Sequence, residues 1–150
     1  MKYSVQANGA TSLNPGIPMP KAAQEAHGIS DAFLADKPEF ITVASELLDF
    51  VGGAEVVLHN APFHLLFLDA ELQRIGLPLF STHCDQIVDL LKRTKQFRPG
   101  KQNGIHQLCV EYGIDDSMRQ KGGALIDAEL LAEIYLLLRL ASPDEAVVAG

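Results

Sequence analysis

The sequence lacks the features of a membrane or secreted protein. None of its apolar runs reaches the ~18 residues needed to cross a bilayer, and the N-terminal MKYSVQANGA has no apolar core of a signal peptide. Cysteine is scarce: Cys84 and Cys109 are the only two, and their spacing is not that of metal ligands. Two reduced thiols and a cytoplasmic location are therefore expected.

Positive charge is also in short supply. The chain has 12 Lys and Arg residues against 19 Asp and Glu, a net charge of −7. This balance argues against a protein that coats nucleic acid through bulk charge. A local basic site is still compatible with it, because five cations fall within the segment 92–101: Lys92, Arg93, Lys95, Arg98 and Lys101. They either contact DNA phosphates or form an ordinary solvated helix face and loop.

Repeats and low-complexity tracts are absent, and the composition, 47% apolar and 21% charged, is that of a globular protein. We expect one domain over residues 1–150, with an irregular segment at 1–19 and a frayed tail at 142–150. Apolar periodicity and turn residues predict helices at 20–28, 38–51, 62–76, 90–97, 103–113 and 123–140. Pro38 suits a first helical turn, and Asp89 is placed to cap the helix at 90–97.

Strands are fewer than a comfortable sheet needs. Residues 54–60 and 83–89 read as buried strands, and a weaker edge strand is expected at 2–6 or 10–13. Helices that alternate with strands indicate an α/β fold, but one with a sheet short of strands.

Five stretches carry a family resemblance by their order and spacing. They are HGISDAFLADKPEF (27–40), VVLHNAPF (56–63), PGKQN (99–103), LCVEYGID (108–115) and GALIDAELLAEIY (123–135). Over residues 14–140 the chain resembles the epsilon subunits of bacterial DNA polymerase III, a family of 3′–5′ proofreading exonucleases. The resemblance implies a ribonuclease-H-like α/β exonuclease fold, here truncated so that the first strands of the central sheet are missing.

The resemblance also implies a catalytic pattern that this chain largely lacks. Such enzymes hold two Mg²⁺ or Mn²⁺ ions between four carboxylates, and a histidine activates the attacking water. The first family motif, Asp-x-Glu-Thr, has no counterpart in residues 1–40. In the second, His64 replaces the ligand aspartate. In the third, Gly122 replaces the histidine, and only Asp127 is retained. We therefore expect no bound cofactor.

Two interpretations of Asp127 stay open. It is either an inherited carboxylate near a helix N-terminus or one half of a residual metal site with His64, since softer ions such as Zn²⁺ accept imidazole. Asp127 shares a helix face with Leu131, Ile134 and Leu138, so we expect it to point inward and to require a partner.

The second motif also suggests contacts to nucleic acid. His59, Asn60 and Phe63 stand where the family approaches its terminal nucleotide. Phe63 would stack against a base, or else pack into the core.

The shortage of strands predicts an assembly. A strand at 55–59 without its neighbours exposes an unpaired edge, which tends to pair with another chain. We expect a homodimer that repairs its incomplete sheet, with exchange of N-terminal segments as one route.

The function that fits these features is that of a non-catalytic homologue that binds protein or nucleic acid, as an accessory to a replication complex. One alternative is a 3′–5′ exonuclease with unconventional metal ligands or a site completed by a partner chain. Another is a decayed fragment that folds without selected activity.

Overall fold

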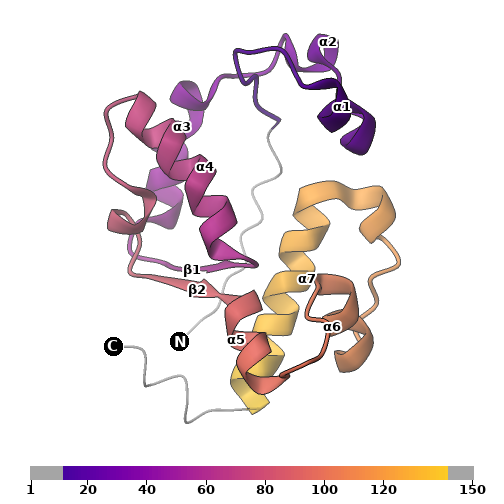
Figure 1. Ribbon diagram of the computed structural model, residues 1–150. Helices are drawn as coiled ribbons and strands as arrows, with labels where there is room; N and C mark the ends of the chain where they lie inside the picture. Colours follow the sequence, from indigo (N-terminus) through magenta and orange to yellow (C-terminus); the bar gives the residue numbers. More distant parts are fainter. Residues whose placement is uncertain (1–11, 142–150) are drawn as a thin grey trace. The chain divides into compact units, whose positions relative to one another are not determined.

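The computed structural model describes residues 12–141 (Figure 1). These residues form two compact units. We call residues 55–64 and 86–141 the sheet unit, and residues 12–54 and 65–85 the helical unit. The expected irregular segment falls on described residues only at 12–19, which form neither helix nor strand. Residues 1–11 and the expected tail at 142–150 lie outside the described residues.

The sheet unit contains two parallel strands, β1 (Glu55–Leu58) and β2 (Gln86–Asp89). Glu55 pairs with Gln86 at one end and Leu58 with Asp89 at the other. Both strands are shorter than predicted, because Asn60 turns the chain with φ 72° and a 3₁₀ turn, η1 (Phe80–Thr82), precedes β2. The weak strand expected at 2–6 or 10–13 lies outside the described residues except for 12–13, which form no strand.

Three helices complete the sheet unit: α5 (Leu90–Phe97), α6 (Ile105–Tyr112) and α7 (Arg119–Ala141). α6 packs on α7, α7 contacts β1, and α5 contacts both strands (Figure 1). Leu90, Leu108 and Ile134 are fully buried in their shared core. The α/β class expected from the sequence is therefore confirmed, with a two-stranded sheet in the described residues.

A polar cluster fixes α7 to the start of β1. The Tyr135 hydroxyl donates to Glu55, and Arg139 Nη1 lies 3.2 Å from the same carboxylate oxygen. Burial, and then the hydrogen bond to the Glu55 carboxylate, raise the pKa of Tyr135. The phenol therefore stays protonated and can keep donating.

α7 begins earlier than the sequence suggests. The sequence predicts it from residue 123, whereas the helical span starts at Arg119 and breaks at Gly123, where φ is 61° and ψ −155°. Glycine tolerates this conformation because it has no Cβ. The break separates a short first segment from the long apolar helix.

The helical unit consists of α1 (Lys21–His27), α2 (Asp31–Leu34), α3 (Phe40–Val51), η1 and most of α4 (Ala61–Arg74), whose first four residues belong to the sheet unit. α2 was not predicted; the Ser30 hydroxyl accepts the Phe33 N–H and caps it. α3 starts after Glu39, so Pro38 precedes its first turn rather than occupying it. Among the described residues, no helix is long and apolar enough to cross a membrane.

Candidate functional site

The two strands end side by side, and one carboxylate joins their ends. Asp89 Oδ1 accepts the Asn60 N–H at 3.2 Å and the Lys92 N–H at 3.2 Å. The second bond is the predicted cap of α5, which is thereby confirmed. Asn60, predicted to contact nucleic acid, thus has its backbone held in the left-handed turn that leads from β1 into α4.

His59 precedes that turn and is half-buried. Burial lowers the pKa of its imidazole, against the opposing effect of the nearby Asp89 charge. Its Nδ1 is buried and has no hydrogen-bond partner in the part of the chain that the structure describes. A neutral ring with one unsatisfied nitrogen therefore lies at the carboxyl end of β1.

His64 occupies the position where the family places a ligand aspartate. Its Nε2 lies 3.2 Å from the His59 carbonyl oxygen, so this nitrogen must carry the proton and donate. Its ring meets Phe63 edge-on, with centroids 5.6 Å apart. Phe63 is 54% exposed, which contradicts the core-packing interpretation and leaves base stacking as the open one.

Asp127 has a strong partner that the sequence did not indicate. Arg119 Nε donates to Asp127 Oδ1 at 2.6 Å, and Nη2 lies 3.4 Å from Oδ2. The hydrogen bond to Asp127 raises the pKa of Arg119, so the guanidinium is charged at every physiological pH. The expected partner is therefore present, and the Asp127 side chain is 38% exposed, so it is partly rather than fully buried.

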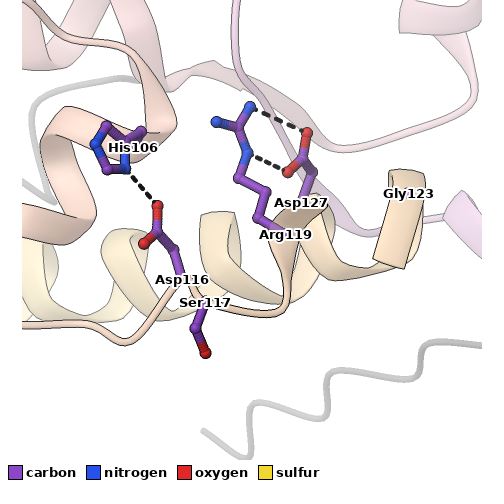
Figure 2. A pocket seen from close by; sticks show the side chains of 6 residues that line it. All are labelled: His106, Asp116, Ser117, Arg119, Gly123 and Asp127. Carbon is purple, nitrogen blue, oxygen red and sulfur yellow. Dashed lines mark hydrogen bonds and ion pairs between the residues drawn. The ribbon is translucent and has the colours of Figure 1, made fainter. Parts of the chain in front are cut away.

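A cavity of about 460 Å³ surrounds this ion pair (Figure 2). On its other side His106 Nδ1 lies 2.6 Å from Asp116 Oδ2. Figure 2 shows the Ser117 side chain pointing away from the imidazole, so these residues form no Ser-His-Asp triad. Gly122, which stands where the family has its catalytic histidine, supplies no side chain to this region.

The five predicted DNA-contacting cations are not equivalent. Lys92 and Lys95 are exposed and Arg93 is half-exposed, and the structure gives these three no ion pair among residues 12–141. Arg98 instead is 9% exposed; it is paired with Glu111 and bonded to Asn103 Oδ1 at 3.0 Å. Lys101 lies 3.5 Å from the same Glu111. Arg98 thus has a structural role, because its guanidinium is turned into the protein.

The described residues do not fit a two-metal centre. Hard divalent ions require several oxygen ligands, mainly carboxylates. Within residues 12–141, no three His, Cys, Asp or Glu side chains come together in a way that would hold a metal. Both oxygens of Asp127 face Arg119, and His64 directs Nε2 at a carbonyl.

The sequence did not indicate Arg119 or Asp116, and His106 fits no ligand spacing and reads as a surface or satisfied core histidine. Arg119 stands eight residues before Asp127 and across the break at Gly123, so helical spacing gave no signal for the pair. His106 and Asp116 are ten residues apart on α6 and the following loop. Only packing of α6 on α7 brings these groups to one cavity.

The chain is similar in sequence to proteins of known families. The exonuclease family model matches residues 4–135. The DNA polymerase III epsilon subunit of Haemophilus influenzae is 41% identical over 143 residues, which cover 92% of this chain and 56% of that protein. The epsilon subunit of Escherichia coli is 46% identical over 114 residues, covering 75% of this chain and 46% of that protein. The chain thus spans about half the length of these relatives.

A solved structure supports the same fold. Exonuclease X in complex with 5′-overhanging duplex DNA superposes with a TM-score of 0.62 at 21% identity, covering 87% of this chain and 72% of that one. Together with the family match, this confirms the resemblance argued from the motifs and the truncated exonuclease fold expected from it. The chain belongs to the exonuclease family, alongside the epsilon subunits of bacterial DNA polymerase III.

Proposed function

We propose that this chain is a non-catalytic member of the exonuclease family that acts by binding rather than by cleavage. The ion pair between Arg119 and Asp127 carries the proposal. Asp127 is the one catalytic position retained in the family motifs, and the permanently charged Arg119 guanidinium lies against both of its carboxylate oxygens.

Electrostatics makes this arrangement unfavourable for phosphodiester hydrolysis. A two-metal mechanism needs a concentrated negative charge to hold its cations. Here the Arg119 guanidinium neutralises the remaining carboxylate, and His64, which cannot supply a negative charge, replaces the ligand aspartate of the second motif. With Gly122 in place of the general base, the attacking water has no group at that position to accept its proton.

Single-stranded DNA is the partner that the sheet unit favours. Lys92, Arg93 and Lys95 present cations along α5, and Phe97 at its end is 42% exposed. Cations that follow a backbone, next to an aromatic ring, suit single strands. The relatives are named as subunits of DNA polymerase III, and exonuclease X is seen in complex with DNA, which supports the choice.

The homodimer remains part of the proposal. In the described residues β1 and β2 pair only with each other, so each strand has one unpaired edge. A second copy that adds strands to these edges would satisfy their backbone groups. A protein monomeric by light scattering at ~10 µM, the concentration that suits a Kd near 1 µM, would contradict it.

A nuclease assay tests the absence of catalysis. The 150-residue chain is incubated with 5′-labelled single-stranded DNA in Mg²⁺ or Mn²⁺. The Escherichia coli epsilon subunit serves as a positive control. We expect no shortening by the wild-type chain or by Asp127→Ala. Shortening by the wild-type chain that Asp127→Ala abolishes would establish an exonuclease with unconventional ligands.

The same samples separate binding from decay. Retention of labelled DNA that weakens as salt rises, and that persists in Asp127→Ala, supports a binding protein. A chain that neither cuts nor retains DNA, and that remains monomeric, is a folded remnant, and the proposal fails.

A further inference from the structure

A second hollow lies in the helical unit, and none of the residues that line it belongs to the three catalytic motifs. It is a groove of about 470 Å³ between one face of α3 and the segment that follows α4. Ile41, Ala44 and Leu48 line it from α3 at helical spacing, and Ile75 and Leu77 line it from the other side. Ile41 is 60% exposed, so an apolar surface is open to solvent there.

The far wall of the groove is set by the end of α4. Gly76 adopts φ 75°, and the Leu77 N–H donates to the Leu72 carbonyl at 2.9 Å. This is the pattern of a Schellman motif, in which glycine ends the helix and the next residue turns back over the last turn. Leu77 is thereby fixed at the groove although it is 36% exposed.

His83 gives the groove an unsatisfied polar atom. It lines the groove, and its Nε2 is buried and has no hydrogen-bond partner among the described residues. A buried polar group without a partner is costly and uncommon in native proteins.

The charge of the helical unit decides what kind of partner fits. Its described residues include three Lys and Arg against nine Asp and Glu, a net charge of −6. Asp49 lines the groove itself, and Glu46 is exposed on the same helix. This field repels nucleic acid and attracts cations.

We propose that this groove docks a basic amphipathic helix of a partner protein. Apolar side chains at i, i+3 and i+4 of that helix enter between Ile41, Leu48 and Leu77, as in helix-in-groove recognition. Its lysines or arginines lie over Asp49 and Glu46. The residues of this site all belong to the helical unit, whereas the cations of the proposed DNA-binding site belong to the sheet unit.

The test uses a defined probe, a fluorescent peptide of leucine and lysine with leucines at i, i+3, i+4 and i+7. We expect saturable binding to the full chain by anisotropy. A peptide of the same composition in scrambled order keeps the charge but loses the apolar face, and it should bind about tenfold more weakly. Equal binding of both peptides, or no saturable binding, overturns the proposal.

Variants locate the site. Ile41→Glu and Ser45→Arg, both at exposed positions on α3, should each lower the affinity for the leucine–lysine peptide about tenfold. Val110→Glu, at a 68% exposed position on α6, adds the same charge outside the helical unit and should leave binding unchanged. Circular dichroism checks that each variant is folded. Equal loss with Val110→Glu, or none with either groove variant, refutes the site.

Sedimentation distinguishes the remaining occupant. If the chain self-associates without peptide and Ile41→Glu makes it monomeric, a second copy fills the groove and the proposed partner is wrong. Self-association that survives Ile41→Glu leaves the groove free for the peptide, and the result of the anisotropy experiment then decides.

Discussion

The two units use charge in opposite ways. The described residues of the sheet unit have eight Lys and Arg against eight Asp and Glu, whereas those of the helical unit have three against nine. The ion pairs of the sheet unit join residues from eight to eighty-four positions apart, such as Arg119 with Asp127 and Arg139 with Glu55. Those of the helical unit, among the same described residues, join neighbours no more than four apart.

This difference distinguishes charges that stabilise the fold through ion pairs from charges that remain available to bind a partner. In the sheet unit half of the eight anions have an ion-pair partner at least eight positions away, whereas the three cations of α5, Lys92, Arg93 and Lys95, have none among the described residues. In the helical unit the described ion pairs leave most of the acidic residues without a cationic partner, and one of these, Asp49, lines the apolar groove. Of the net charge of −7, the described residues of the helical unit contribute −6, whereas those of the sheet unit are neutral in sum.

The largest effect is expected from the apolar core of the sheet unit. Leu108→Ala removes a fully buried side chain from that core and should lower the free energy of unfolding by about 2–5 kcal/mol. Val110→Ala, two residues away but 68% exposed, should change it by less than about 0.5 kcal/mol. Urea titration measures both. Similar values for the two variants would mean that α6 is not packed as described.

A smaller loss should follow from breaking a long-range ion pair. Arg98→Ala leaves the buried Asn103 Oδ1 without its donor, at a cost of about 1–3 kcal/mol in unfolding free energy. Lys95→Ala, on the exposed face of α5, is the control and should be close to neutral. Equal stability of the two variants would mean that Arg98, like Lys95, is exposed to solvent and does not stabilise the fold.

The same pair gives a pH dependence with a definite sign. The hydrogen bond from Arg98, and after it the charge of Arg98, hold the pKa of Glu111 below its ordinary value of 4.5. Because the folded pKa is the lower one, the stabilisation is present above the unfolded value and is lost as pH falls through the folded value. The difference between wild type and Arg98→Ala should therefore shrink from about pH 7 to about pH 3 in urea titrations. A difference that grows in acid would contradict the assignment.

DNA binding should depend on one unit only. Charge reversal at Lys92 and Lys95 together should weaken the binding of single-stranded DNA. It should also lower the magnitude of the slope of log K against log salt concentration by about 1–2, since each phosphate contact contributes ~0.7. Lys21→Glu, in the helical unit and highly exposed, should do neither. Anisotropy at several salt concentrations measures both quantities. An equal effect of Lys21→Glu would mean that bulk charge, and not α5, governs binding.

Local signals in the sequence predicted much of this fold. Helical spacing and glycine stops located α1, α3, α4, α5 and α6, with their ends shifted by a few residues. The Asp89 cap was predicted because it depends on residues only three apart. The strands were recognised from β-rich runs between turn residues, but their ends depend on the backbone of Asn60 and on η1.

The candidate site was less accessible, because its contacts are not local. Asp127 and His64 were identified by motif, yet the partner of Asp127 lies across a glycine break and could not be inferred from helical spacing. Arg98 looked like one of five equivalent cations, and only the position of Glu111, thirteen residues later on α6, removes it from the set. Sequence patterns thus showed which residue types are present, while tertiary packing decides which of them are neutralised.

The smallest effect should come from the acidic surface of the helical unit. Glu46 and Asp49 stand three residues apart on α3, where like charges repel. Glu46→Lys should raise the free energy of unfolding by about 0.2–0.5 kcal/mol at low salt, and the gain should vanish at high salt because the surface charges are then screened. The same variant should weaken the leucine–lysine peptide, since it removes one of the anions that attract it. A variant that is both more stable and less able to bind would show that the excess acid of this unit is kept for recognition at the expense of stability. Tighter peptide binding by Glu46→Lys would instead mean that the acidic charge of this unit does not attract the peptide to the groove.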